Sequence, residues 1–167
     1  MTDAPDRRRE YTWTDPQQIV DVAPETTGIE FLRRMLAGDV PTPPIASTLD
    51  FALIEADDRR VTVRAVPAVW AYNAVGSVHG GVIATWCDTA IGYSIQTTLR
   101  PGFSMTTLDL QVRYLKKIVV ATGPVRITAT TDHAGRSTGS AHAEVRDEAG
   151  ALLATATSTC LILSPRE

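Results

Sequence analysis

Residues 79–99, HGGVIATWCDTAIGYSIQTTL, decide the fold. Their large apolar side chains recur at the three- and four-residue spacing of a helix, and the positions between them are mostly Gly, Ala, Thr or Cys. A helix that is apolar or small on nearly every face is buried in a folded protein. The stretch therefore predicts one long, central helix that other elements must cover.

The segments around this helix mostly follow the two-residue period of strands with one buried face. A shorter amphipathic helix over residues 29–36, preceded by Gly28 and stopped by Gly38, is the exception before the strands begin. The predicted strands cover residues 47–56, 60–66, 106–115, 122–132, 136–147 and 151–163. Short turns containing Gly135 and Gly150 join the last three into an antiparallel meander. We expect an α+β fold in which a curved antiparallel sheet of five or six strands wraps the long helix.

The first 28 residues differ from the rest of the chain. Residues 1–10 are charged and contain proline, and residues 11–27 mix apolar side chains with prolines. Such a segment covers a core without forming one of its own. We expect two parts, a partly disordered N-terminal extension (residues 1–28) and one folded domain (residues 29–167).

Composition excludes several classes of protein. With 16 Lys and Arg against 19 Asp and Glu, the formal charge of −3 gives no field that attracts nucleic acid. No stretch reaches the ~18 apolar residues of a membrane span, and no secretion signal is visible. Cys87 and Cys160 lie in apolar runs and are expected to be free thiols, with a disulfide the less favoured alternative. We expect a cytoplasmic protein that binds neither nucleic acid nor membrane.

Metal chemistry is not expected either. The chain has three histidines without ligand spacing, and it has no Cys-x-x-Cys pair. We predict no metal site.

Asp88 is the most informative single residue. It is the only acidic residue between His79 and Arg100, and no Lys or Arg lies inside the helix to pair with it. Burying a lone carboxylate costs several kcal/mol unless hydrogen bonds hold it, so a functional role is the favoured explanation. The alternative is that Asp88 faces a polar gap or caps a neighbouring loop.

The loop of residues 73–81, NAVGSVHGG, enters this helix through Gly80 and Gly81. The first N–H groups of a helix have no partner within it, and glycines let a ligand oxygen approach them, although an ordinary helix entry is an alternative. Asp88 lies roughly 12 Å along the helix from Gly80, too far to share one small group. A two-fold axis between two subunits would bring the helix start of one to the carboxylate of the other.

The pattern N-x-x-G-x-x-H-G-G at residues 73–81, Asp88 in the helix, and TLDLQVRYL at residues 107–115 together resemble the hotdog-fold thioesterases of the PaaI (phenylacetic acid degradation) type. The resemblance covers roughly residues 29–163. It implies the hotdog fold, a long helix wrapped by a curved antiparallel sheet. It also implies hydrolysis of acyl-CoA by a homodimer or by a homotetramer that is a dimer of dimers. No cofactor is implied, since coenzyme A is part of the substrate.

The resemblance assigns two central roles. Asp88 matches the family's catalytic acid, either as general base for water or as nucleophile. Gly80 and Gly81 match the glycine pair whose amide polarises the thioester carbonyl and holds the oxyanion.

Polar neighbours complete the expected site. Asn73 would orient water or the thioester, and His79 either fixes the loop by a hydrogen bond or exchanges a proton. Thr107 matches a hydroxyl that positions water, but Thr106 is adjacent, and the strand register decides which of them points inward. The alternative is that either threonine is present only because β-branched residues are favoured in strands.

Basic side chains are needed for the three phosphate groups of coenzyme A. The resemblance favours Arg136 and Ser137 for the nucleotide end, with Lys116, Lys117 and Arg113 at the end of the strand over 106–115; solvated strand edges are the alternative. The chain departs from the family here, because no proline follows the basic residues.

The acyl preference is left open among small, aromatic and medium-chain groups. Four side chains are candidates for shaping the acyl pocket: Trp86, Tyr93, Phe103 and Met105. Two other functions remain as alternatives, a hotdog hydratase or dehydratase that pairs His with Asp or Glu, and a non-catalytic acyl-CoA binding module.

Overall fold

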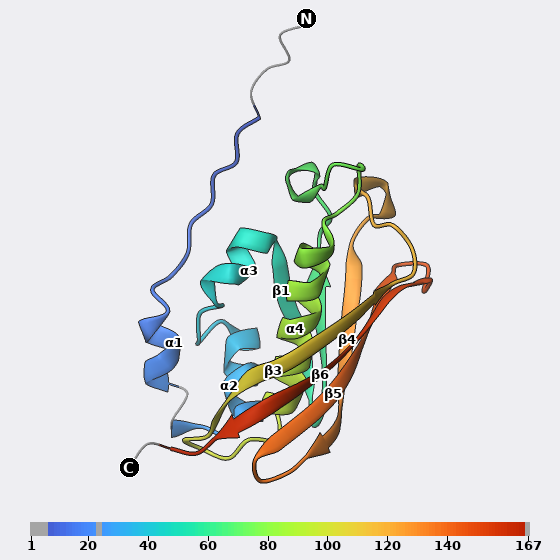
Figure 1. The fold of residues 1–167 in the computed structure, drawn as a ribbon. Coiled ribbons are helices and arrows are strands. Elements are labelled where there is room, and N and C mark those ends of the chain that lie inside the picture. The colour runs from blue at the N-terminus through green and yellow to red at the C-terminus, as the bar shows by residue number, and fades with distance from the viewer. Residues whose placement is uncertain (1–6, 23–24, 166–167) are drawn as a thin grey trace, which may run out of the picture.

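A computed structural model describes residues 7–22 and 25–165 of the chain (Figure 1). The elements are α1 (Gln17–Val22), α2 (Gly28–Ala37), α3 (Pro44–Leu49), β1 (Phe51–Asp57), β2 (Arg60–Ala65), η2 (Val69–Ala71), α4 (Gly80–Gln96), β3 (Ser104–Tyr114), η3 (Val120–Thr122), β4 (Val125–Ala134), β5 (Thr138–Asp147) and β6 (Leu152–Leu163). The six strands form one sheet in the order β1-β2-β4-β5-β6-β3, with every neighbouring pair antiparallel. This sheet curves around α4, as Figure 1 shows, and confirms the predicted α+β fold.

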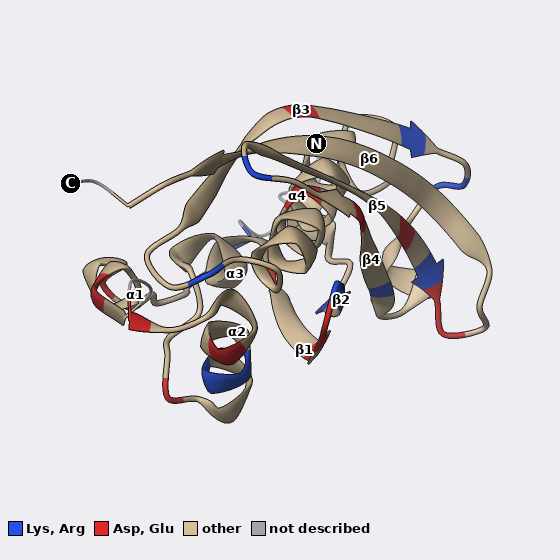
Figure 2. Ribbon diagram, turned by 90° about the horizontal axis from the view of Figure 1, so that it is seen from below, with Lys and Arg blue, Asp and Glu red and all other residues tan. Residues whose placement is uncertain are grey.

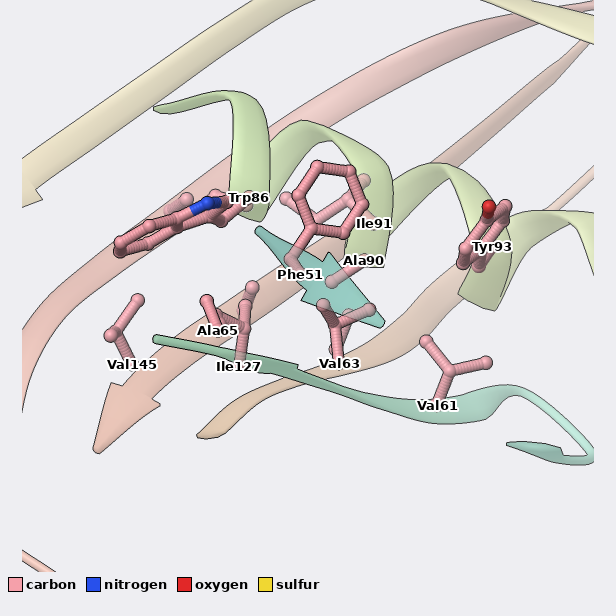
Figure 3. Close-up of a cluster of buried hydrophobic side chains, with 14 of the residues drawn as sticks. Phe51, Val61, Val63, Ala65, Trp86, Ala90, Ile91, Tyr93, Ile127 and Val145 are labelled. Carbon is pink, nitrogen blue, oxygen red and sulfur yellow. The ribbon is translucent and has the colours of Figure 1, made fainter. Parts of the chain in front are cut away.

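The core lies between α4 and the concave face of the sheet. Trp86 and Ile91 of α4 are fully buried, and they belong to one cluster with Val63, Ile127 and Val145 from three strands (Figure 3). The Trp86 indole N–H donates to the Leu49 carbonyl oxygen at 3.1 Å. The polar group of this large buried side chain therefore has a hydrogen-bond partner. The predicted burial of this helix is confirmed for these residues.

One predicted element is wrong. Residues 47–49 were expected to begin a strand, but they complete α3. Pro44 occupies the first turn of this helix, where its missing N–H costs nothing, and Asp50 ends it in the left-handed conformation with φ 54°. The strand therefore starts at Phe51.

The N-terminal segment lies against the domain through Arg9. Its guanidinium donates to the Ser47 carbonyl oxygen at 3.0 Å and lies 3.6 Å from the centroid of the Trp70 ring. Residues 7–16 contain no helix or strand, and the short helix α1 follows them. Part of the predicted disordered stretch, residues 1–6, is outside the described residues, and the domain boundary at residue 28 stays a prediction.

Helix α2 begins in close contact with the end of α4. The Gly28 N–H donates to the Leu99 carbonyl oxygen at 3.0 Å, and a Cβ added to Gly28 would lie 1.7 Å from the backbone oxygen of Gln96. A backbone atom cannot move aside as a flexible side chain can. This position therefore requires glycine for close approach.

Replacing Gly28 by Ala is expected to lower the free energy of unfolding by about 3 kcal/mol or more, because α2 must shift away from α4. Urea denaturation at fixed protein concentration measures the change. The control is Gly38→Ala at the other end of α2, where nothing crowds a Cβ but φ is +87°; its cost is about 1 kcal/mol. Equal losses for the two variants would contradict the proposed steric cause.

Strand β3 forms one edge of the sheet, and it contains a bulge. Thr107 pairs with Cys160 and Asp109 pairs with the adjacent Thr159, so Leu108 is the extra residue. Strict alternation back from Leu110 would turn Thr106 toward the helix. The bulge instead turns Thr107 toward α4 and leaves Leu108 57% exposed, so the predicted alternation fails at Leu108.

Candidate active site

Asp88 lies in the middle of α4 and accepts a hydrogen bond from Thr107. The Thr107 Oγ1 donates to Asp88 Oδ1 at 2.9 Å, across the space between the helix and the edge strand. Within residues 7–22 and 25–165, no ion pair involves Asp88, which matches the sequence reading of an uncompensated carboxylate. The bulge in β3 decides the question left open between Thr106 and Thr107: it is Thr107 that reaches the carboxylate.

The expected full burial of Asp88 is wrong for the single chain. Asp88 is half-buried, as Thr85 is, and Gly81 is exposed. At 3.6 residues per turn, these three positions fall within about 60° of one another around the helix axis. They form an open face of α4, defined by Gly81, Thr85 and Asp88, while Trp86 and Ile91 point into the core.

Replacing Thr107 by Val is expected to lower kcat about tenfold, because it removes a hydrogen bond to a charged group and frees the Asp88 carboxylate to turn. With the thioester substrates that the sequence resemblance implies, steady-state rates of thiol release measure the effect. The matched control, Thr106→Val, changes a neighbouring β3 threonine that does not contact Asp88. If both variants lose the same activity, the loss belongs to the strand and not to the hydrogen bond.

The start of α4 is held by two side chains. The His79 Nδ1 accepts the Gly81 N–H at 2.9 Å, and the Tyr114 hydroxyl donates to the Gly80 carbonyl oxygen at 2.8 Å. The peptide group between the two glycines is therefore fixed at both its N–H and its C=O. In the part of the chain that the structure describes, the Gly80 N–H has no acceptor.

The two predicted amides therefore differ. The Gly81 N–H is used by the helix cap, whereas the Gly80 N–H has no acceptor among the described residues and lies at the positive end of the helix, where an oxygen atom of a ligand is favoured. Of the two roles considered for His79, the structure shows the hydrogen bond that fixes the loop. An accepting Nδ1 carries no proton, so the hydrogen bond holds only while the His79 ring is neutral.

Asn73 organises the loop before the helix. Its Oδ1 accepts N–H groups of Val75 at 3.0 Å and Ser77 at 3.2 Å, and its Nδ2 donates to the Ser77 hydroxyl at 3.2 Å. These bonds use the side chain inside its own loop. Its role toward water or the thioester stays a prediction.

A cavity of about 290 Å³ opens beside Gly80. Its lining includes Asn73, Gly80, Tyr114, Lys116 and Lys117. Two of the predicted basic residues therefore lie at the helix start, and Figure 2 shows the basic residues at the end of β3 and in the loop after it. The loop is held by its backbone, because the Ile118 carbonyl oxygen accepts the Val78 N–H at 2.8 Å.

Tyr114 is the contact that sequence reasoning missed. Its ring lies against the helix start, where a Cβ on Gly80 would meet the ring and hydroxyl at 3.1 Å. Burial raises the pKa of Tyr114, so the hydroxyl keeps the proton that it donates to Gly80. Alternation along the predicted strand over residues 106–115 puts Tyr114 on the same, apolar side as Leu110 and Val112, opposite Arg113. That position was the available signal.

Three other predicted residues lie elsewhere in the single chain. Arg113 is on the outer face of the sheet and lines a shallow cavity with Thr155 and Thr157. Arg136 and Ser137 lie in the turn between β4 and β5, and Arg136 lines a small cavity with residues just after α4. That end is separated from Gly80 by the length of α4, about 25 Å. The chain alone brings none of the three to the helix start.

Cys87, next to Asp88 in sequence, is excluded as a nucleophile. Burial, followed by the nearby Asp88 charge, raises the pKa of its thiol to about 12, so the reactive thiolate is scarce. Both cysteines are free and buried, as predicted. The described residues contain no group of three or more His, Cys, Asp or Glu side chains placed to hold a metal. No described helix is long and apolar enough to cross a membrane.

Comparison with known proteins places this geometry in a family. The model of the thioesterase superfamily matches residues 75–154, which include the helix start, Asp88 and Thr107. The structure of a putative thioesterase related to phenylacetic acid degradation, from Ralstonia eutropha, is 30% identical, with 77% of this chain and 97% of that chain covered and a TM-score of 0.71. A search of curated proteins finds no match.

Two further solved structures agree. A Streptococcus mutans protein with bound acetyl-CoA is 28% identical, covering 70% of this chain and 91% of that one, with a TM-score of 0.63. The Escherichia coli PaaI protein of the phenylacetic acid degradation operon, 18% identical with 83% and 96% covered and a TM-score of 0.70, shares the fold. The chain therefore belongs to the thioesterase superfamily, as a thioester hydrolase with the PaaI-type hotdog fold.

Proposed function

We propose that the protein hydrolyses acyl-CoA to the free acid and coenzyme A at a site made by two subunits. The observation that carries this proposal is the pairing of an uncompensated carboxylate, Asp88 held by Thr107, with a free amide at Gly80 on the same helix. One group can take a proton from water, and the other can hold a developing oxyanion.

The distance between these groups argues for two subunits. Asp88 and Gly80 lie about 12 Å apart along α4, whereas both must lie within about 3 Å of the reacting groups. An antiparallel arrangement of two α4 helices, open face to open face, would place each Gly80 beside the other subunit's Asp88. Strand β3 supports a two-fold axis of this kind. It is an 11-residue strand at the edge of the sheet, so the backbone N–H and C=O groups on its outer side can pair with β3 of a second subunit.

The chemical steps follow from the two groups. The thioester carbonyl oxygen accepts the Gly80 N–H, which polarises the carbonyl carbon. Asp88 takes a proton from a water molecule as the water oxygen bonds to that carbon. The tetrahedral intermediate then collapses, the C–S bond breaks, and the coenzyme A sulfur leaves and takes up a proton from Asp88. Direct attack by Asp88 is the alternative, with an anhydride that water later opens.

Coenzyme A would lie along the cavity beside Gly80. Lys116 and Lys117 line it and supply positive charge for phosphate groups. In the antiparallel arrangement, the end of the other subunit's α4 lies about 12 Å beyond Gly80. Its Arg136 and Ser137 could then reach the nucleotide end, which they cannot do within one chain. The proposed site uses no metal and no cofactor, in a cytoplasmic homodimer or a homotetramer of two dimers.

The hydratase alternative has less support. It needs a histidine paired with a carboxylate at the site, and His79 instead accepts the Gly81 N–H. Among the described residues, the histidine in hydrogen-bond contact with a carboxylate is His142, whose Nδ1 lies 2.7 Å from Asp132 Oδ1. His142 lies on the outer face of β5, between the buried Ala141 and Ala143, and therefore points away from α4.

A thiol-release assay with acetyl-, octanoyl- and phenylacetyl-CoA tests the proposed function. Free thiol from at least one of them supports hydrolysis. Crotonyl-CoA is added as the hydratase probe, since hydration removes its enoyl absorbance without releasing thiol. Tight binding by isothermal titration without thiol release would contradict the proposal and favour a binding module.

A further inference from the structure

We infer that Tyr114 is a positioning residue for the oxyanion site, and that its hydroxyl fixes the direction in which the Gly80 N–H meets the thioester carbonyl. This inference rests on the proposed function, because it states how a group of the same site is held. Tyr114 is the last residue of β3, and the proposed reaction gives it no chemical step. Its effect on the reaction passes through Gly80.

The start of α4 needs support from outside the helix. Gly80 and Gly81 are its first two residues. Glycine has more backbone freedom than any other residue, and the ends of helices fray. A donor that stabilises an oxyanion must already be in place when the charge forms. Because the Gly80 N–H has no acceptor among the described residues, its direction depends on the peptide groups around it.

Tyr114 supplies this support from β3. Its hydroxyl donates to the Gly80 carbonyl oxygen at 2.8 Å. The ring covers the Cα of Gly80, where an added Cβ would lie 3.1 Å from both the hydroxyl oxygen and the ring carbon that carries it. Although the residue as a whole is 51% exposed, its hydroxyl end is therefore in contact with the helix. One polar contact and one steric contact thus fix Gly80 relative to the strand.

The peptide group that carries the free N–H lies between two groups that are held. Its carbonyl oxygen, which belongs to His79, accepts two N–H groups of the first helical turn at 3.0 and 3.3 Å. The next peptide group, between Gly80 and Gly81, donates its N–H to His79 Nδ1 and accepts the Tyr114 hydroxyl. Without Tyr114, the hydrogen bonds that the described residues make to the glycine pair all come from α4 and its cap, His79.

A bulge allows the same strand to hold Asp88 as well. Thr107 and Tyr114 are seven residues apart, and in a regular strand an odd separation places two side chains on opposite faces. The bulge at Leu108 shifts the alternation by one residue, so that both side chains reach α4. Strand β3 thus holds the Asp88 carboxylate through Thr107 and the Gly80 peptide through Tyr114. The two groups of the proposed reaction are positioned by one edge strand.

The contribution of Tyr114 is expected in the chemical step. The carbonyl oxygen of the bound substrate carries a partial charge, whereas the oxyanion of the tetrahedral intermediate carries a full one. A Gly80 N–H that points in the wrong direction therefore loses more in the transition state than in the bound substrate, so kcat falls while KM is nearly unchanged. A side chain that only shaped the cavity for coenzyme A would instead change KM. Steady-state kinetics distinguish the two roles.

Tyr114→Phe keeps the ring and removes the hydroxyl. With the acyl-CoA of the panel that is turned over fastest, we expect kcat to fall about fivefold, the effect of one hydrogen bond, and KM to stay within about twofold. The matched control is Tyr93→Phe, which should not change kcat. Tyr93 and Trp86, two of the acyl-pocket candidates, lie in the core, and the Tyr93 hydroxyl is 3.7 Å from the Met35 sulfur. An unchanged kcat in Tyr114→Phe, a loss carried entirely by KM, or equal losses in both variants would overturn the inference.

A second comparison uses a chain that lacks the amide. Gly80→Pro removes the N–H, so Tyr114→Phe has no donor left to position and should change the residual kcat less than about twofold. Thr107→Val acts on Asp88 instead, and in the same background it should still lower the residual kcat about tenfold. An equal loss from Tyr114→Phe with and without Gly80→Pro would overturn the inference, because the hydroxyl would then act through something other than the amide. Absence of thiol release by the wild type from every acyl-CoA would instead contradict the proposed function itself.

Discussion

Replacing Asp88 by Asn is expected to lower kcat about a thousandfold. The amide has nearly the shape of the carboxylate, and its oxygen can still accept the Thr107 hydroxyl, but it cannot take a proton from water. The folded and oligomeric states should therefore be preserved while the chemical step fails. Steady-state thiol release from octanoyl-CoA, with gel filtration of both proteins, measures the two properties.

The control for Asp88→Asn is Asp109→Asn. Asp109 also carries one negative charge and lies on β3, two residues beyond Thr107, but it has no contact with Asp88. We expect the kcat of Asp109→Asn to lie within about twofold of the wild-type kcat, as for an ordinary surface substitution. If Asp88→Asn keeps more than a tenth of the wild-type rate, or if both variants lose it equally, Asp88 is not the base.

Replacing Gly80 by Pro is expected to lower kcat by about a hundredfold to a thousandfold, because it removes the N–H that would hold the oxyanion. Proline suits this position in the helix. Gly80 is the first residue of α4, where proline is favoured, and His79 has the extended ψ of 137° that a residue before proline requires. Thiol release and circular dichroism would show a folded protein with a slow chemical step.

Gly80→Ala is the matched control for this change. Both variants add a Cβ that meets the Tyr114 ring at 3.1 Å, but only alanine keeps the N–H. We expect Gly80→Ala to lose far less activity than Gly80→Pro. Similar losses would assign the effect to the contact with Tyr114, and the role of the amide would be wrong.

Most of the fold was predictable because its signals are local. The apolar and small residues of α4 and the alternation in β4, β5 and β6 depend on periodicity alone, and these elements were found with boundaries close to the observed ones. The position of β3 at the sheet edge beside β6 could not be read in this way, because strand order is set by tertiary packing. The helix α3 was missed for a different reason, since its six residues show too little of a period.

The site was predictable at the level of residue types and less so in its details. Asp88 stands out because the helix contains no Lys or Arg to pair with it, and burying an unpaired carboxylate costs free energy, which favours a functional role. The bulge that turns Thr107 inward, and the hydrogen bond that occupies the Gly81 N–H, depend on three-dimensional register and could not be predicted. Arg113 is different, because alternation already placed it opposite Tyr114, on the face away from α4.

The central claim is that each site takes Asp88 from one subunit and Gly80 from another. Co-expression of Asp88→Asn and Gly80→Pro chains tests it most directly. Each variant alone is inactive, but a mixed dimer would combine an intact Gly80 with an intact Asp88 at one of its two sites. With random pairing, half of the dimers are mixed, so we predict about a quarter of the wild-type activity. Activity no higher than that of the two parent variants would show that the site is not shared between subunits.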